Sequence, residues 1–368
     1  MQVLVTGSKG FIGKNLVIEL AQLDSIRIDT HDRDDDLLLL ESKINKADII
    51  FHLAGENRPK DEKEFDVSNH QLTKLICQLS DKLDKKIPII FSSSTQAEDD
   101  NPYGKSKLAA ETVLRELEQK SGCSVVIYRL PGVFGKWSKP NYNSVVATFC
   151  FNIASKLPIQ INDPNKILTL VYIDDIVKSF INNILHKEKL PLWGEIKPKY
   201  SITIQALANQ LQLFADSRTT LITERVGCDL TRALYATYLS FLPPDKFTYD
   251  IPFFPDKRGV FAEVLKTHDS GQFSFFTTLP GITRGQHFHN SKSEKFIIIK
   301  GKAKFRFRHL ITNDRLEIFS SSDKLTIVET IPGWVHDITN VGENEMIAML
   351  WANEIFDREQ PDTISSEV

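Results

Sequence analysis

Cysteine pairs, long apolar runs and an excess of one charge are all missing from this chain of 368 residues. Its four cysteines are scattered and form no closely spaced pair, which argues against a secreted disulfide framework. No apolar stretch approaches the ~20 residues of a membrane-spanning helix, and no signal peptide is recognisable at the N-terminus. The formal charge of −3 lacks the basic excess that usually accompanies nucleic-acid binding. We therefore expect a cytoplasmic protein that binds neither membranes nor nucleic acid.

The length and composition favour two globular domains. Hydrophobic residues make up 41% of the chain and charged residues 25%, which is typical of folded proteins and excludes disorder. Four prolines and several aromatic residues without helical periodicity fall within residues 240–258, and this composition marks a connection between domains. We predict one domain at residues 1–245 and a second at residues 246–368.

The two parts differ in their hydrophobic pattern. Residues 1–245 alternate short apolar runs with longer amphipathic stretches, which predicts an α/β domain with a doubly wound parallel sheet. The acidic run at residues 32–36 is expected to be a solvated loop. The second part contains short β-branched and aromatic runs, which predict a small antiparallel barrel or jelly roll. Expected strands cover residues 2–7, 25–30, 47–55, 87–94, 124–130, 272–278, 295–300, 302–310, 324–330 and 346–352, and expected helices cover residues 11–23 and 103–120.

Three glycines lie between the first expected strand and the first expected helix. Gly7, Gly10 and Gly13 would let the backbone approach a pyrophosphate at the helix N-terminus, although ordinary tight turns contain such glycines too. Asp29, near the end of the second expected strand, could bond a ribose hydroxyl of NAD. Arg33 could instead pair with the 2′-phosphate of NADP. The residues leave this choice open, with NADP favoured.

A tyrosine and a lysine at i, i+4 form the most specific pair of the N-terminal domain. Tyr103 and Lys107 would project from one face of the expected helix, and Ser94 ends the strand before it. A phenol has an ordinary pKa of ~10, and we expect the Lys107 ammonium and a cationic nicotinamide to lower it. Tyr103 could then protonate a carbonyl oxygen while hydride reaches the carbon. In isolation, such a pair is more often a solvated helix face.

Five segments together resemble the extended short-chain dehydrogenases/reductases that act on nucleotide sugars. They read TGSKGFIG, HLAG (residues 52–55), FSSS (91–94), YGKSK (103–107) and VYIDD (171–175), and the resemblance covers roughly residues 1–240. It implies a Rossmann-like fold and the catalytic residues Ser94, Tyr103 and Lys107. The residues that the resemblance implies for NADPH, or less favourably NADH, are Gly7, Gly10, Phe11, Ile12, Gly13, Arg33, Leu53, Ala54, Gly55, Tyr103 and Lys107.

One segment departs from this family. Many members have an Arg-x-x-Asn-x-Phe-Gly segment on the substrate side, and here the segment begins at Arg129 and has Gly132 in place of the asparagine. The resemblance therefore implies that Arg129 binds substrate, without the contact that the asparagine would make. It also implies a homodimer.

Three histidines and a glutamate in the C-terminal domain have the pattern of a metal site. His287 and His289 share one face if they lie on a strand, and Glu294 follows after a short turn. His336 is expected to precede another strand. Three imidazoles and one carboxylate suit Zn²⁺ or another first-row divalent ion, although a lone histidine is usually structural.

The spacing of these residues resembles the cupins, whose jelly-roll barrels bind metal. The pattern G-x5-H-x-H-x4-E-x6-G runs from Gly281 to Gly301. The segments DKRGVFAE (256–263) and RGQH (284–287) also resemble deoxysugar-nucleotide 3,5-epimerases, and this implies that Arg258 and Arg284 contact a nucleotide. Those epimerases use no metal and have a lysine at the position of Glu294. We therefore expect a metal ion to acidify the C–H bond next to a C4 ketone.

The order of the two domains resembles a family of bifunctional bacterial enzymes in the UDP-N-acetyl-L-fucosamine pathway, which serves capsular polysaccharide and O-antigen. That resemblance implies epimerisation at C3 of UDP-2-acetamido-2,6-dideoxy-β-L-arabino-hexos-4-ulose by the cupin domain. Reduction at C4 with NADPH would follow and give UDP-2-acetamido-2,6-dideoxy-L-talose. Two alternatives remain open: a 4-keto-6-deoxy-sugar reductase whose β domain only folds or dimerises the protein, and a sensor that binds dinucleotide and sugar without catalysis.

Overall fold

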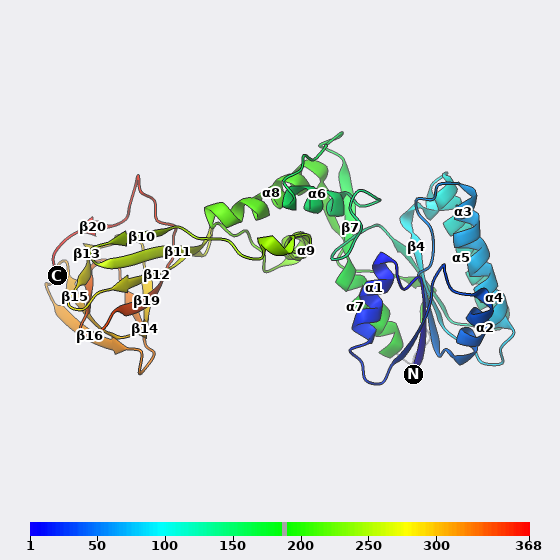
Figure 1. The fold of residues 1–368 in the computed structure, drawn as a ribbon, viewed down its shortest axis with the longest axis horizontal. Coiled ribbons are helices and arrows are strands. Elements are labelled where there is room, and N and C mark those ends of the chain that lie inside the picture. The colour runs from blue at the N-terminus through cyan, green and yellow to red at the C-terminus, as the bar shows by residue number, and fades with distance from the viewer. Residues whose placement is uncertain (186–189) are drawn as a thin grey trace. The chain divides into compact units, whose positions relative to one another are not determined.

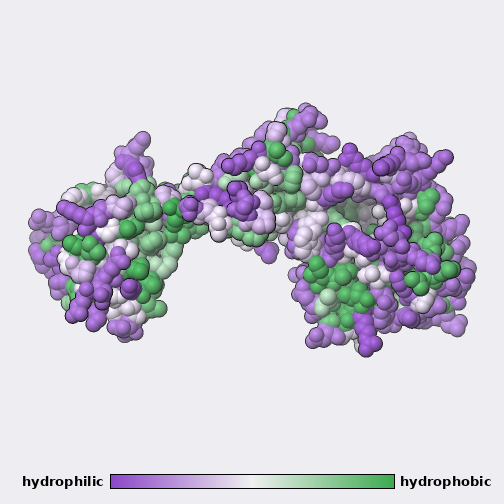
Figure 2. Space-filling model, viewed as in Figure 1, coloured by the Kyte–Doolittle hydropathy of each residue, from purple (hydrophilic) through white to green (hydrophobic). Residues whose placement is uncertain are grey.

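The computed structural model describes residues 1–185 and 190–368, and the chain divides into two compact units. The first unit contains Met1–Leu211 and Ala233–Leu242, and the second contains Gln212–Arg232 and Pro243–Val368 (Figure 1). The main division therefore falls at residues 242/243, and the segment Gln212–Arg232 groups with the second unit. None of the described helices is long and apolar enough to cross a membrane. Hydrophilic residues cover much of the face of each unit that Figure 2 presents.

The first unit is built on a parallel sheet with strand order β2-β1-β3-β4-β5-β8. The order reverses direction between β1 and β3, and ligands of open α/β sheets bind at such a reversal, outside the carboxyl ends of the strands. The prediction of a Rossmann-like α/β domain is confirmed. The strands are β1 (Gln2–Thr6), β2 (Arg27–His31), β3 (Ile49–His52), β4 (Ile89–Ser94), β5 (Val125–Leu130) and β8 (Trp193–Gly194).

Helices cover both faces of this sheet (Figure 1). Apolar side chains of α1 and α7 pack on one face, and those of α2, α4 and α5 pack on the other. A smaller sheet with the order β6-β7-β9 completes the unit. The elements are α1 (Phe11–Leu20), α2 (Leu37–Lys46), α3 (Lys63–Phe65), α4 (Leu72–Asp81), α5 (Pro102–Ser121), α6 (Val145–Ala154), α7 (Ile173–Leu185), α8 (Ile204–Thr220), α9 (Asp229–Leu239), β6 (Gly132–Phe134), β7 (Ile167–Tyr172) and β9 (Tyr200–Thr203), with short turns of helix at Asp66–Gln71 and Thr95–Glu98. The end of α8 and the start of α9 lie in the segment that groups with the second unit, which also contains a short turn of helix at Pro244–Lys246.

The second unit contains two antiparallel sheets that enclose an aromatic core. Their strand orders are β10-β11-β12-β19-β14-β17 and β16-β15-β18-β13-β20. Phe276 and Phe296 of the first sheet pack with Phe305 and Phe307 of the second. The predicted all-β domain is thus confirmed. Its strands are β10 (Phe253–Asp256), β11 (Gly259–Thr267), β12 (Gly271–Thr278), β13 (Thr283–Phe288), β14 (Glu294–Lys300), β15 (Lys302–His309), β16 (Arg315–Ser321), β17 (Ile327–Thr330), β18 (Trp334–Asn340), β19 (Met346–Ala352) and β20 (Ile364–Ser365).

Candidate functional site

A cavity of about 620 Å³ lies in the first unit, at the carboxyl ends of β1, β3 and β4. This is the edge at which the strand order reverses, so the cavity occupies the expected ligand position of the fold. Ten of the predicted cofactor and catalytic residues line it. They are Gly7, Gly10, Phe11, Ile12, Gly13, Leu53, Gly55, Ser94, Tyr103 and Lys107.

The glycine-rich turn is too tightly packed for side chains. A Cβ atom on Gly7 would lie 2.6 Å from the backbone nitrogen of Ala54, and one on Gly13 would lie 2.2 Å from the carbonyl oxygen of Gly7. Gly10 is the N-cap of α1, and no side chain caps this helix end. The first N–H groups of α1 therefore remain available for an anionic group such as a pyrophosphate.

The local sequence of α5 places Tyr103 and Lys107 at its first two turns. The side chain of Asn101 accepts a hydrogen bond from the backbone N–H of Gly104 and caps the helix, and Pro102 occupies its first position. Ser94 ends β4, the strand before the helix. The buried Lys107 donates to the carbonyl oxygen of Ser92 at 3.0 Å.

Burial controls the protonation of these side chains. It raises the pKa of Tyr103, and a hydrogen bond with Ser94 only partly opposes this rise. The sequence predicts a lowered pKa when the Lys107 ammonium acts together with a cationic nicotinamide, and this joint effect stays a prediction. In the protein by itself, desolvation of the phenolate is the larger effect. Burial also lowers the pKa of Lys107 to about 8. At neutral pH, Tyr103 is therefore a protonated acid and Lys107 is mainly an ammonium.

The residues at and after the end of β2 do not line the cavity, although the sequence predicts that they contact the cofactor. Asp29 accepts a hydrogen bond from the Gln2 side chain at 2.8 Å, and Arg33 pairs with Glu56 at 3.0 Å. Neither Asp29 nor Arg33 lines the cavity. The acidic run was expected to be a solvated loop, but Asp32 is buried. Its carboxylate accepts hydrogen bonds from the Ser8 hydroxyl at 2.5 Å and from a backbone N–H of the glycine-rich turn at 3.0 Å.

Arg129 is not brought to the cavity. Its guanidinium pairs with the buried Glu111 at 2.6 Å and with Glu98 at 2.5 Å, and it stacks on Trp193. Ala54 also lies outside the lining of the cavity, and its backbone packs against Gly7.

The cavity is also lined by residues that the sequence analysis missed. Trp137 and Tyr142 come from the segment after β6, and the Tyr142 hydroxyl donates to Glu56 at 2.8 Å. Isolated aromatic residues in a loop have no periodicity or motif, so no sequence signal distinguishes these two from surface residues.

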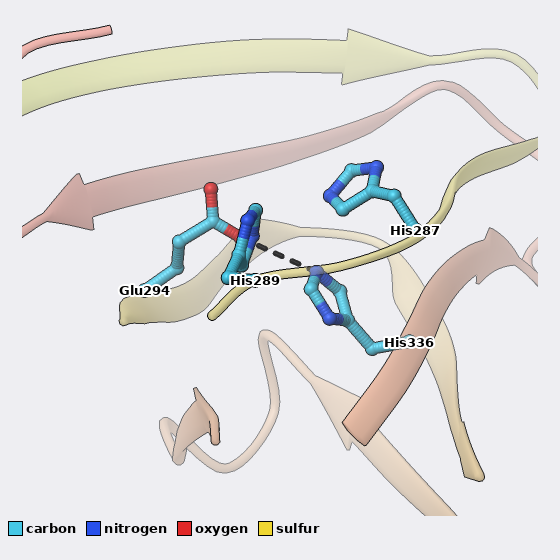
Figure 3. Close-up of side chains that lie close together, drawn as sticks. All are labelled: His287, His289, Glu294 and His336. Carbon is cyan, nitrogen blue, oxygen red and sulfur yellow. Dashed lines mark hydrogen bonds and ion pairs between the residues drawn. The ribbon is translucent and has the colours of Figure 1, made fainter. Parts of the chain in front are cut away.

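In the second unit, His287, His289, Glu294 and His336 converge (Figure 3). One ligand atom from each lies within 4.8 Å of all the others. A β-bulge in β13 sets this arrangement, because Gly285 and the next residue have positive φ angles and His287 is thereby paired with His336 on β18. The sequence predicts that His336 precedes a strand, but it lies inside β18.

The cluster has the charge and burial of a cation site. Glu294 Oε2 lies 3.3 Å from the Nε2 atoms of both His289 and His336, and its Oε1 lies 3.3 Å from the Lys292 ammonium. Burial would raise the pKa of Glu294, but its contacts with His289 and His336 and the charge of Lys292 bring the pKa well below its ordinary value. Burial and then the charge of His336 lower the pKa of His287 to about 4.

These donors fit a divalent ion. The site offers one ionised carboxylate and three imidazoles, which are the ligands that Zn²⁺ prefers. Among the described residues, neither ring nitrogen of the buried His336 has a hydrogen-bond partner. Buried polar atoms without partners are rare in proteins, so this ring is free to act as a ligand.

Arg258 and Arg284 are brought together beside Asp256. Arg258 pairs with Asp256 at 2.6 Å, and Arg284 lies 3.6 Å from the other oxygen of that carboxylate. Arg284 also donates to the Thr278 hydroxyl at 3.1 Å. Two guanidinium groups against one carboxylate leave a net positive charge, which suits a diphosphate.

Comparisons with known proteins agree with both units. Residues 3–202 match the NAD dependent epimerase/dehydratase family, and residues 254–364 match the polysaccharide biosynthesis C-terminal domain. A UDP-2-acetamido-2,6-beta-L-arabino-hexul-4-ose reductase of Pseudomonas aeruginosa is 52% identical over 368 residues, which span 100% of this chain and 99% of that protein.

Two solved structures extend the comparison. The capsular polysaccharide assembling protein CapF from Staphylococcus aureus matches over 100% of both chains, with a TM-score of 0.93 and 42% identity. The UDP-glucuronic acid 4-epimerase of Bacillus cereus, in complex with NAD, matches 66% of this chain and 98% of its own, with a TM-score of 0.56. At 18% identity this second likeness concerns the fold alone.

Proposed function

Because this chain belongs to the NAD dependent epimerase/dehydratase family and ends in a polysaccharide biosynthesis C-terminal domain, we propose that it converts a UDP-linked 4-keto-6-deoxy sugar in two steps. The second unit inverts C3, and the first unit then reduces C4. The product is UDP-2-acetamido-2,6-dideoxy-L-talose, which enters capsule or O-antigen synthesis. The observation that supports the reduction most strongly is the cavity lined by Ser94, Tyr103, Lys107 and the glycine-rich turn.

In the reduction, the bound nicotinamide supplies a hydride to C4. The protonated phenol of Tyr103 donates its proton to the C4 oxygen, and Ser94 holds the same oxygen by a hydrogen bond. The Lys107 ammonium binds the nicotinamide ribose and stabilises the phenolate that remains. We propose NADPH as the reductant because Arg33, whose side chain is 65% exposed, can leave Glu56 for a 2′-phosphate.

In the epimerisation, the second unit is a cupin that binds its metal through His287, His289, Glu294 and His336. A divalent ion held there would act as a Lewis acid at the C4 ketone and make the C3 proton acidic. Arg258 and Arg284 bind the diphosphate of the substrate. Epimerisation precedes reduction, since the C3 proton is acidic only while C4 is a ketone. The enzyme acts as a cytoplasmic homodimer.

Replacement of Tyr103 by phenylalanine tests the reduction. The variant Tyr103→Phe lacks the proton donor, so its kcat for NADPH oxidation with the UDP-4-keto sugar falls by about 10²–10⁴-fold. Tyr128→Phe is the matched control, because the Tyr128 hydroxyl contacts Ser179 and does not line the cavity. Equal turnover by both variants would exclude Tyr103 as the proton donor.

A further inference from the structure

A carboxylate near the end of the chain holds the loop that joins two residues of the histidine–glutamate cluster. Asp362 accepts hydrogen bonds from three successive backbone N–H groups of residues 290–292, at 2.8, 2.7 and 2.9 Å. It accepts a fourth bond from the Ser291 hydroxyl at 3.0 Å. The loop runs between His289 and Glu294, so its conformation determines how these two side chains approach each other.

The same residue also orients one of the imidazoles. Nδ1 of His289 is hydrogen-bonded to the backbone carbonyl oxygen of Asp362, and this nitrogen must be the donor. A neutral imidazole has one donor nitrogen and one acceptor nitrogen. In the neutral form that a metal ion requires, Nε2 of His289 therefore carries the lone pair, and it lies 3.3 Å from Glu294 Oε2. A hydrogen bond of this kind fixes the tautomer and orientation of metal-binding histidines.

The segment that contains Asp362 is anchored on the strand of another member of the cluster. β20 pairs with β13, where Ser365 lies opposite His287. Arg308 donates to the carbonyl oxygen of Glu367 at 2.7 Å and holds the last residues in place. The position of Asp362 is therefore set from both sides: by the loop that it binds and by the strand that follows it.

We propose that Asp362 is a positioning residue of the metal site, and this inference rests on the metal binding proposed above. Its carboxylate holds the loop of residues 290–292, and its carbonyl group selects the tautomer of His289 that can donate a lone pair. Both effects arrange the ligands before an ion arrives. Removal of the carboxylate leaves four ligands in the chain but makes their arrangement less favourable for binding.

Competition with a chelator in the full-length protein measures this effect directly. Zn²⁺ affinity of Asp362→Ala is expected to fall about 10–100-fold, as is usual for residues that support metal ligands, and that of Asp362→Asn to fall less. The control is Asp357→Ala, because Asp357 is exposed in the same segment. Among the residues that the structure describes, its carboxylate bonds neighbouring backbone alone, such as the N–H of Glu359 at 2.8 Å. Its affinity should equal that of the wild type.

Two further readouts separate positioning from general stability. The thermal unfolding of each metal-free variant reports on the fold, and the visible spectrum of the Co²⁺-loaded protein reports on ligand geometry. A lower unfolding temperature of Asp362→Ala with unchanged affinity and spectrum would overturn the inference. If Asp362→Ala does not fold, the unfolding temperature, Zn²⁺ affinity and Co²⁺ spectrum of Asp362→Asn are compared with those of the wild type instead. A wild-type protein that binds neither ion would overturn the proposed metal site itself and this inference with it.

Discussion

Desolvation of single side chains decides which protonation states are present in the cofactor cavity. Lys107 is buried and Tyr103 is partly buried, and desolvation disfavours the charged form of each. The phenol therefore stays protonated at neutral pH and is ready to donate, while the lysine has a pKa close to neutrality. This distribution favours carbonyl reduction over alcohol oxidation, since reduction starts from the protonated tyrosine.

The pKa of Lys107 predicts the basic limit of the reaction. It is lowered from 10.5 to about 8, so the ammonium is present below that pH and is lost as the pH rises above it. We expect kcat/KM for reduction to fall above about pH 8, up to tenfold for each further pH unit. A pH profile with NADPH and the UDP-4-keto sugar measures this fall.

The arginine variant provides the control for this assignment. Lys107→Arg retains its positive charge throughout, so any activity that it keeps should lack the fall near pH 8. A wild-type profile that stays level to about pH 9.5 would contradict the role of the ammonium.

Motifs at fixed spacing were sufficient to identify several of these residues. Tyr103 and Lys107 lie in one helix, and their shared approach to the cavity follows from the i, i+4 spacing. Arg129 could not be placed in this way, because its partner Glu111 comes from a different element. The burial that raises the pKa of Tyr103 could not be predicted either, since it depends on the packing of segments that are distant in sequence.

Among the elements, the turn before α1 makes the firmest prediction. In Gly13→Ala the new methyl group would meet the Gly7 carbonyl oxygen at 2.2 Å, so the turn must move. We expect the Kd for NADPH to rise by about 5–150-fold, the equivalent of about 1–3 kcal/mol of misfit. Calorimetric titration measures the change.

The variant Gly122→Ala tests whether loss of NADPH affinity is specific to the turn before α1. Gly122→Ala at the end of α5 meets no atom within 4 Å and should leave the Kd unchanged, although its positive φ makes the alanine slightly strained. Unaltered binding by Gly13→Ala would mean that the cofactor does not lie against this turn.

The bulge in β13 is the corresponding element of the second unit. Gly285 has φ +93°, and a Cβ there would lie 2.9 Å from the carbonyl oxygen of His336. Gly285→Ala should therefore shift His287 from its position opposite His336 and lower the Zn²⁺ affinity about tenfold or more. Chelator competition measures it.

Gly281→Ala is the matched variant for the bulge. Its φ of +72° imposes similar backbone strain, but no atom lies within 4 Å of the added carbon. Equal losses of metal affinity in both variants would show that backbone strain, and not the register of β13, is responsible.

Elements were easier to predict than their ends. The expected helix at residues 103–120 is α5 (Pro102–Ser121), and the expected strand at residues 346–352 is β19 (Met346–Ala352). β2 continues to His31, two residues beyond Asp29, because an edge strand of a sheet accepts polar residues that interrupt an apolar pattern. Asp32, directly after this strand, thereby reaches the glycine-rich turn and is buried, while Asp34 and Asp36 of the acidic run remain exposed as predicted.

At the scale of the whole molecule, each unit carries one of the two proposed reactions. The double variant His287→Ala/His336→Ala removes two ligands from the second unit and no residue that lines the cavity of the first. It should lose Zn²⁺ binding and C3 exchange, while its Kd for NADPH stays within about twofold of the wild type. Loss of NADPH binding in this variant would contradict the assignment.

The division into an α/β part and a β part was predictable from hydrophobic patterns, but contacts across the sequence were not. The segment Gln212–Arg232 groups with the second unit although it begins within helix α8. Asp362 binds residues more than 69 positions earlier, and it lies beyond the last strand that the sequence predicts. Such long-range contacts leave no local periodicity.

Exchange of the C3 proton tests the central claim most directly. The UDP-4-keto-6-deoxy sugar is incubated with the metal-loaded enzyme in D₂O without nicotinamide, and the sugar is analysed by mass spectrometry. We expect a gain of one deuteron, at C3, because the proposed epimerisation by the second unit does not depend on hydride transfer. No exchange would contradict it and would leave a reductase with a non-catalytic β domain, whereas two deuterons would indicate epimerisation at C5 as well.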